Sequence, residues 1–275
     1  MRFYTVEDVQ AFRSVEFLFI KTSLSAHTFT ITLNRPEKRN AFTPTMAEEI
    51  TFALAYAHFN HEIRCVVINA EGPVFCAGAD LNAFHDASAD RRNPALPVIR
   101  EEVRLGDAFA DLLKPSIAQV EGPVLAGGFL IICGCTFVFS VSEATFSLPE
   151  VKRGIWPMQV MASLSSMIPP RKILEMCITG DTYNAGEALE LGLVTHVSKK
   201  EDIANDVNQF AKKISANAPL AIQSGMSALH QLNAISENER HAFLKQQLDL
   251  LLESEDAKEG MQAFKEKRSP NWKAK

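Results

Sequence analysis

Short apolar segments recur along the chain and alternate with helical patterns, and this alternation restricts the possible folds most. Residues 65–70 (CVVINA), 116–121 (SIAQVE) and 136–140 (TFVFS) are each short and mostly apolar. Such segments are typical of parallel strands that are buried on both faces of a sheet. Helical patterns precede the first two of them, at 44–57 and 98–112. Strands that alternate with helices in this way predict a right-handed α/β arrangement with a parallel sheet.

Local signals place several element ends. Residues 16–22 and 28–33 are predicted to pair as strands around a turn at 23–27. Thr43 and Pro44 form a typical helix start, a hydroxyl N-cap followed by proline in the first turn. A helix is expected to begin at residue 122, after the second apolar strand. The polar stretch 85–93 is expected to be mobile.

The pattern changes after residue 197. Ile203, Val207, Phe210 and Ile214 recur at helical spacing. Three further helical patterns follow over 219–232, 241–253 and 257–267. We therefore divide the chain into an α/β part, residues 1–197, and an all-helical part, residues 198–275. The helical part carries more apolar side chains than a monomer can bury, which favours an oligomer.

Composition excludes several classes of function. Twenty-eight basic and 33 acidic residues give a net charge of −5, which argues against nucleic acid as the main partner. The longest apolar run, 123–139, is interrupted by glycines and fits a buried helix and strand better than a membrane span. An odd number of cysteines, 5, without zinc spacing indicates reduced thiols, no metal site and a cytoplasmic protein. The N-terminal residues lack the apolar region of a signal peptide.

Two glycine-containing loops follow predicted strands. They are residues 76–80 (CAGAD) and 122–129 (GPVLAGGF). Glycine lets a backbone approach a ligand closely, and two converging N–H groups form an oxyanion hole. Tight turns alone would also explain these glycines. Spacing does not decide between the two interpretations.

Six collinear segments resemble the enoyl-CoA hydratase/isomerase (crotonase) superfamily. They are LNRPEKRNAF (33–42), FCAGADL (75–81), KPSIAQVEGPVLAGG (114–128), ATFSLPEVKRGIWP (144–157), ITGDTYNAGEALELGLV (178–194) and EGMQAFKEKRSPNW (259–272). The resemblance implies an α/β fold, a crotonase-like spiral of ββα turns with a C-terminal all-helical trimerisation region. It also implies an acyl-CoA thioester as substrate, no cofactor other than the coenzyme A of that substrate, and a homotrimer or homohexamer.

The resemblance also implies roles for single residues. The two backbone N–H groups that polarise the thioester carbonyl in the family match Ala79 and Gly127, and a catalytic carboxylate matches Glu150. Phe264 and Lys267 match a segment that reaches toward the CoA of a neighbouring subunit. The implied substrate-binding residues are Lys38, Arg39, Ala77, Asp80, Leu81, Leu130, Trp156, Phe264 and Lys267.

Leu130 is where the chain departs from the family's hydratases. Their first carboxylate falls on Leu130, which cannot transfer a proton. Hydration needs one group to activate water and another to protonate the α-carbon. Three interpretations therefore stay open: a hydratase/isomerase-type enzyme (a lyase or an isomerase) acting through an enolate in the oxyanion hole, a single-base isomerase or acyl-CoA decarboxylase, and a non-catalytic acyl-CoA-binding protein. His85 is an alternative acid or base.

Overall fold

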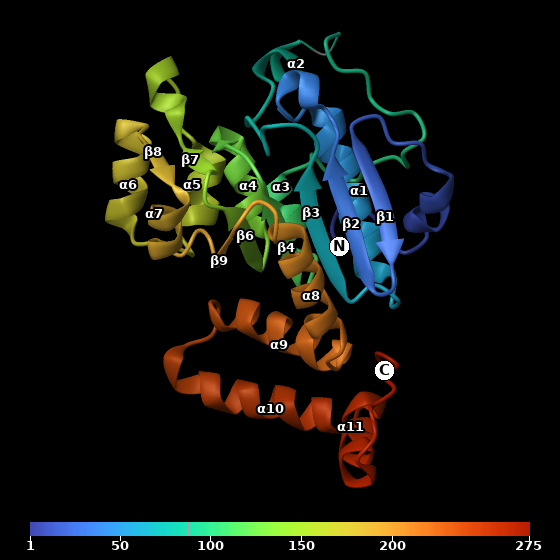
Figure 1. The fold of residues 1–275 in the computed structure, drawn as a ribbon. Coiled ribbons are helices and arrows are strands. Elements are labelled where there is room, and N and C mark those ends of the chain that lie inside the picture. Colours follow the sequence, from blue (N-terminus) through green and yellow to red (C-terminus); the bar gives the residue numbers. More distant parts are fainter. Residues whose placement is uncertain (87) are drawn as a thin grey trace.

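The larger of two β-sheets forms the centre of the fold (Figure 1). The computed structural model describes residues 1–86 and 88–275. Within them, the order of the larger sheet is β1-β2-β3-β4-β6-β9. Its strands are β1 (Ile20–Ser25), β2 (Thr28–Leu33), β3 (Cys65–Ala70), β4 (Ser116–Val120), β6 (Phe137–Val141) and β9 (His196–Ser198). Only β1 and β2 pair antiparallel in this sheet, so the predicted parallel sheet is confirmed.

A smaller sheet has the order β5-β7-β8. Its strands are β5 (Val124–Leu125), β7 (Thr145–Ser147) and β8 (Thr182–Asn184). Two isolated bridges join the loops beside it, one between Phe42 and Ala79 and the other between Cys76 and Val124. The first bridge joins the loop at 76–80 to the end of residues 34–42, and the second joins the two glycine-containing loops to each other.

Helix α1 (Pro44–Phe59) is buried over most of its length. The Thr43 side chain accepts a hydrogen bond from the Met46 N–H, so the predicted N-cap is confirmed. At the other end, the Lys114 ammonium donates to the carbonyls of Ala57, Asn60 and Ile63. The remaining helices before residue 200 are η1 (Asp8–Ser14), η2 (Pro36–Lys38), α2 (Leu81–His85), α3 (Leu105–Ala110), η3 (Ala126–Gly128), α4 (Phe129–Gly134), η4 (Pro149–Arg153), α5 (Met158–Leu164), α6 (Pro170–Thr179) and α7 (Ala185–Glu190).

Several predicted element ends are wrong. The first strand runs from Ile20 to Ser25 instead of over 16–22, so the turn predicted at 23–27 is confined to residues 26–27. The strand begins late because the buried Glu49 carboxylate accepts the N–H groups of Leu18 and Phe19. The helix predicted over 98–112 is only α3, and Val98 is 84% exposed. The helix predicted from residue 122 is preceded by β5 and η3, so α4 begins only at Phe129.

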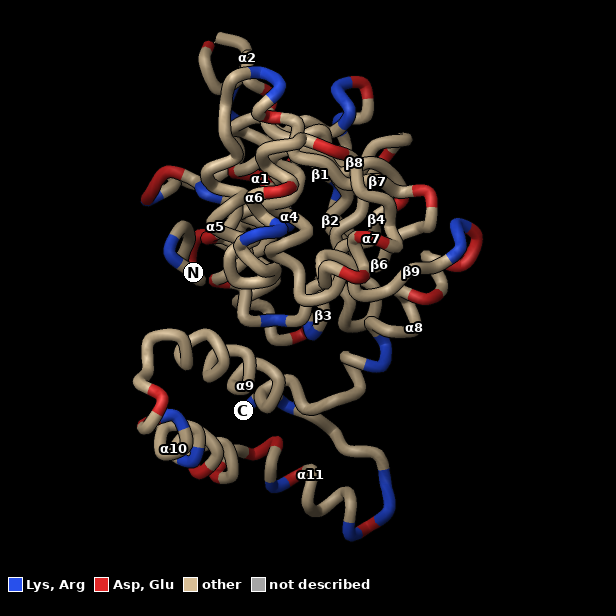
Figure 2. Tube along the Cα trace, turned by 90° about the vertical axis from the view of Figure 1, so that its left-hand side faces the viewer, with Lys and Arg blue, Asp and Glu red and all other residues tan. Residues whose placement is uncertain are grey.

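The helices after residue 200 confirm the predicted helical pattern. Helix α8 (Ile203–Ser215) packs on the larger sheet, whereas α9 (Pro219–Leu232), α10 (Arg240–Leu252) and α11 (Glu255–Glu266) extend away from both sheets (Figure 1). A short turn of helix, η5 (Glu237–Glu239), precedes α10. Helix α9 carries no Lys, Arg, Asp or Glu along its length (Figure 2). Helix α10 buries none of its side chains within the single chain. The helical part therefore exposes much apolar surface.

The cysteines and the lengths of the helices can also be compared with what the sequence predicts. All five cysteines are buried free thiols. Across the described residues, every helix is too short or too polar to cross a membrane.

Candidate active site

Two backbone amides from separate loops lie close together beside Phe42. A Cβ atom placed on Gly127 would lie 3.3 Å from the Ala79 nitrogen and 3.0 Å from the Phe42 ring. Gly78 has a φ of +94°, and an added Cβ would lie 2.7 Å from the Ala126 Cβ. Gly78 is therefore required by both its backbone conformation and the clash, whereas a side chain at Gly127 would force the Phe42 ring to shift.

Neither the Ala79 amide nor the Gly127 amide donates to a protein atom in the contacts of the described residues. The Phe42 N–H donates to the Gly78 carbonyl and the Asp80 N–H donates to the Phe42 carbonyl, each at 2.9 Å. The Ala79 N–H between them therefore points away from the bridge. The Gly127 N–H lies in the first turn of η3, where amides have no partner within the helix. Two donors directed at one oxygen are the arrangement of an oxyanion hole.

Both amides lie on the wall of a cavity with a volume of about 830 Å³. Seven of the residues expected at the site line this cavity. They are Ala77, Ala79, Leu81, Gly127, Leu130, Glu150 and Trp156. His85, the alternative acid or base, also lines it.

Glu150 presents a buried carboxyl group to the same cavity. It lies on η4, is 8% exposed, and its Oε2 atom has no hydrogen-bond partner among the described residues. Burial raises the pKa of the Glu150 carboxyl above its ordinary value, while its own backbone amide and Arg153 partly offset the effect. A partly dry carboxylate with a raised pKa is a stronger base than one in water and is suited to proton transfer.

Leu130 lies on α4 as a buried apolar part of the cavity wall. A Cβ atom placed on Gly106 of α3 would lie 3.9 Å from a Leu130 methyl group, so α3 packs beside Leu130. Trp156 is half-buried, and its indole N–H points to the Met161 sulfur at 3.5 Å. Leu130 and Trp156 thus add apolar surface to the cavity that Glu150 also lines.

Five of the expected substrate-binding residues lie outside the cavity wall. Lys38 and Arg39 are exposed on the neighbouring loop, where the Arg39 carbonyl accepts the Ala77 N–H. The Asp80 carboxylate accepts a hydrogen bond from Arg35 at 2.8 Å, which lowers the pKa of Asp80. Asp80 therefore holds the loop in place.

The other two, Phe264 and Lys267, lie at the end of α11, which is far from α2, α4 and α5, helices that contribute residues to the cavity wall (Figure 1). Phe264 is 86% exposed.

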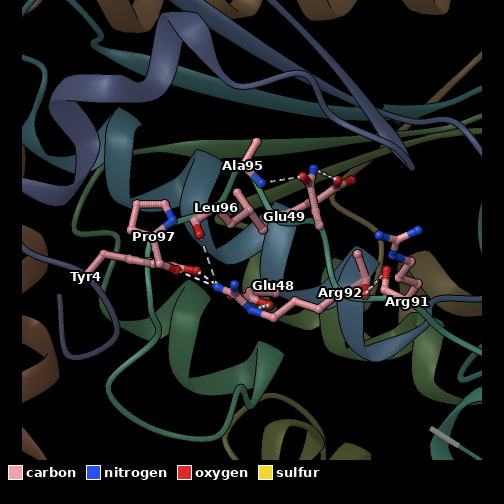
Figure 3. A network of polar contacts seen from close by, with 10 residues as sticks. Tyr4, Glu48, Glu49, Arg91, Arg92, Ala95, Leu96 and Pro97 are labelled. Carbon is pink, nitrogen blue, oxygen red and sulfur yellow. Dashed lines mark hydrogen bonds and ion pairs between the residues drawn. The ribbon is translucent and has the colours of Figure 1, made fainter. Parts of the chain in front are cut away.

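Sequence reasoning missed a polar stretch of the cavity wall formed by α1 and the segment before α3. Glu48 and Arg92 line the cavity and form an ion pair (Figure 3). The segment expected to be mobile is anchored here: Asp90 accepts the Thr45 N–H, and Asn93 donates to Glu49. Residue 87, in the same expected segment, lies outside the described residues. Because these contacts join residues more than 40 positions apart, no local pattern in the sequence signals them.

The described residues contain no group of three or more His, Cys, Asp or Glu side chains placed to hold a metal ion. The chemical groups offered to a ligand are two backbone amides, the buried Glu150 carboxyl group, which forms no ion pair with the described residues, and a mixed apolar and polar wall. This combination can bind a carbonyl oxygen and move a proton on a neighbouring carbon.

Comparisons with known proteins agree with this geometry. The family model described as enoyl-CoA hydratase/isomerase matches residues 24–275. The enoyl-CoA hydratase EchA19 of Mycobacterium tuberculosis is 34% identical, over 90% of this chain and 93% of the relative. A mevalonyl-coenzyme A hydratase of Aspergillus fumigatus is 31% identical, over 90% and 92%. The crystal structure of a probable enoyl-CoA hydratase/isomerase from Mycobacterium abscessus superposes with a TM-score of 0.83 at 26% identity, covering 94% of this chain and 100% of that one.

The fold expected from the sequence is therefore confirmed as crotonase-like. A match over residues 24–275 includes both glycine loops, Glu150 and the C-terminal helices. The chain belongs to the enoyl-CoA hydratase/isomerase family.

Proposed function

We propose that the protein moves a proton on an acyl-CoA thioester through an enolate that the Ala79 and Gly127 amides stabilise, with Glu150 as the proton-transferring base. The observation that carries this proposal is that both amides and the Glu150 carboxyl group line one cavity. The thioester oxygen accepts the two N–H bonds, which acidifies the protons of the α-carbon.

Isomerisation of a 3-enoyl thioester needs only this equipment. Glu150 takes a proton from the α-carbon, and the electron pair of that C–H bond moves into a dienolate whose oxygen lies in the oxyanion hole. The same carboxyl group then returns the proton to the γ-carbon, which gives the 2-enoyl thioester. Because one base serves both steps, Leu130 does not impede the reaction.

Hydration is the second candidate function, and relatives such as EchA19 carry the name enoyl-CoA hydratase. Water attack at the β-carbon needs a base beside that carbon, and Leu130 offers none. We therefore favour isomerisation over hydration. Decarboxylation of an acyl-CoA, which also needs only one base, is favoured over hydration for the same reason. A purely binding protein is disfavoured, because a buried carboxyl oxygen without a partner destabilises the fold and contributes nothing to binding the thioester carbonyl.

We further propose that residues 198–275 assemble the chain into a trimer or a dimer of trimers. Leu248, Leu250 and Phe264 are at least half exposed in the single chain. In the assembly, Phe264 and Lys267 reach the CoA of a neighbouring subunit. The scheme uses no cofactor beyond that CoA, and the buried free thiols fit a reducing compartment such as the cytoplasm.

A panel of CoA thioesters tests the proposal. Wild type, Glu150→Gln and the control Glu143→Gln, an exposed carboxylate outside the cavity, are assayed with 3-enoyl and 2-enoyl thioesters. We expect isomerisation in wild type and in the control, and loss of turnover with retained binding of a saturated thioester in Glu150→Gln. Turnover that survives Glu150→Gln contradicts the role of Glu150 and makes His85 the next residue to replace. Absence of any thioester binding at millimolar concentration contradicts the acyl-CoA assignment itself.

A further inference from the structure

A charged network forms the part of the cavity wall contributed by α1 and the segment before α3 (Figure 3). The Arg92 Nε atom donates to both Glu48 oxygens at 3.1 and 3.0 Å, and Nη2 donates to Oε1 at 2.5 Å. The Tyr4 hydroxyl donates to the same Glu48 Oε1 at 3.1 Å. Tyr4 is fully buried, so the network is fixed from the interior of the protein.

The hydrogen bonds of this network engage both oxygens of Glu48 and leave part of the Arg92 guanidinium without a partner among the described residues. Glu48 is only 8% exposed and its carboxylate already accepts from Tyr4 and Arg92. Arg92 is 43% exposed, and its Nη2 also donates to the carbonyls of Leu96 and Pro97. Among the contacts of the described residues, Arg92 Nη1 donates to no protein atom. Because Arg92 lines the cavity and is partly exposed, a ligand that displaces water from its guanidinium has to supply an acceptor for the Nη1 N–H groups.

The charges on the cavity wall decide which acceptor fits those N–H groups. Besides Glu48, the wall carries the acidic residues Asp90, Glu102 and Glu150, against the basic residues Arg92 and Arg153. The Arg92 charge is already paired with Glu48, so a carboxylate on the ligand would add negative charge to an acidic wall. A hydrocarbon chain would strip water from Nη1 and leave its donors unpaired, which weakens binding. A neutral oxygen avoids both penalties.

We propose that Arg92 determines specificity and that the acyl chain of the substrate carries a neutral oxygen, as a hydroxyl or carbonyl group, that accepts a hydrogen bond from the Arg92 guanidinium. This inference rests on the proposed function, because Arg92 lines the same cavity as Ala79, Gly127 and Glu150.

Tyr4 acts in this site as a positioning residue. It holds Glu48, and Glu48 holds Arg92. Tyr4 lies before residue 24, where the family match begins, so a segment outside that match helps to shape the acyl site. Loss of its hydroxyl should weaken the preference for an oxygenated chain without changing affinity for a hydrocarbon chain.

Calorimetry with saturated thioesters tests the inference without needing turnover. The ligands are saturated acyl-CoA thioesters of short and medium chain length. At each length, three acyl chains are compared, which end in a methyl, a hydroxyl or a carboxylate group. We expect wild type to bind the hydroxyl-ended chain of fitting length about tenfold more tightly than the methyl-ended one, the usual order for a hydrogen bond to a charged donor. Arg92→Met should abolish this ratio, and Tyr4→Phe should reduce it a few-fold. Arg91→Met, which changes a neighbouring arginine outside the cavity wall, should leave it unchanged.

Each outcome decides a separate point. Three results would overturn this inference while the proposed function stands. Wild type could bind the methyl-ended and hydroxyl-ended chains equally, it could bind the carboxylate-ended chain most tightly, or the affinity ratio of hydroxyl to methyl ends could survive Arg92→Met. If no thioester binds, the proposed function fails and this inference with it. Arg92→Lys covers the case in which Arg92→Met does not fold: it keeps the charge but loses the planar fork, so the ratio should fall.

Discussion

Replacing Glu150 with glutamine should remove activity and at the same time stabilise the protein. The Glu150 carboxyl group is 8% exposed, and Oε2 lacks a hydrogen-bond donor among the described residues. A buried polar atom without a partner costs about 1–3 kcal/mol, and a charged one costs more than a neutral one. Glutamine keeps the size of the side chain and removes the charge. We expect it to raise the free energy of unfolding by about 1 kcal/mol at neutral pH, which for a chain of this size is about 2–4 °C in Tm.

The pH dependence of this gain has a definite sign. Burial raises the pKa of the Glu150 carboxyl in the folded state above the value of 4.5 that describes the free side chain. As the pH rises from that value, the unfolded chain loses its proton first, so wild-type stability falls until the folded carboxyl group has also ionised. The gain from Glu150→Gln should therefore be near zero at about pH 4 and fully present once the pH exceeds the raised pKa of Glu150. Turnover, which needs the ionised base, should rise over the same range.

Denaturant unfolding of wild type, Glu150→Gln and Glu143→Gln at acid and neutral pH measures the gain, and assays of turnover measure the loss. Removal of a general base should reduce the rate by about 10²–10⁴. A Glu150→Gln protein that is less stable than wild type at neutral pH would show that the carboxylate is stabilised in the fold. A gain of the same size at both pH values would show that ionisation is not its cause.

Three further predictions concern the rest of the site and the assembly. Leu130→Glu should raise hydration of a short 2-enoyl thioester, measured against wild type, and lower stability because it buries a second carboxyl group; unchanged hydration contradicts the need for that group. Gly78→Ala should reduce turnover by about 10²–10³, because the added Cβ would displace the oxyanion donors, and it should weaken binding of a saturated thioester much less. Wild-type kinetics in this variant would contradict the assignment of the oxyanion hole. Light scattering should find a trimer or hexamer, and Leu248→Glu should give smaller species; a monomeric wild type refutes the assembly.

Elements whose pattern is local could be predicted from the sequence. Helix α8 shows apolar residues at helical spacing, and its start and end agree with that pattern because one face packs on the sheet. The parallel strands could be predicted from the sequence because β3 and β4 are buried on both faces and therefore carry almost continuous apolar runs. The residues of the oxyanion hole came from resemblance, since glycine spacing alone fits an ordinary turn equally well.

Elements that depend on distant partners could not be predicted. The segment before α3 has a helical pattern at Val98, yet residues 90–93 are held by hydrogen bonds to α1, and Pro97 is held by Arg92. Arg92 resembles any surface arginine until α1 places Glu48 against it. The start of β1 likewise depends on Glu49, a residue of α1. In each case, a contact between residues far apart in the chain outweighs the local preference.

Because of the bridges that join the loops, amide hydrogen exchange can measure ligand binding at the site. The Asp80 and Leu125 amides donate to the carbonyls of Phe42 and Cys76 at 2.9 Å, and such amides exchange with solvent only when the structure opens. The Ala79 amide, next to one of them in sequence, has no such bond among the described residues and should exchange much faster in the free protein. An oxygen bound between the Ala79 and Gly127 amides should slow both, even when the bound thioester is inert. Deuterium uptake therefore reports occupancy of the oxyanion hole separately from catalysis.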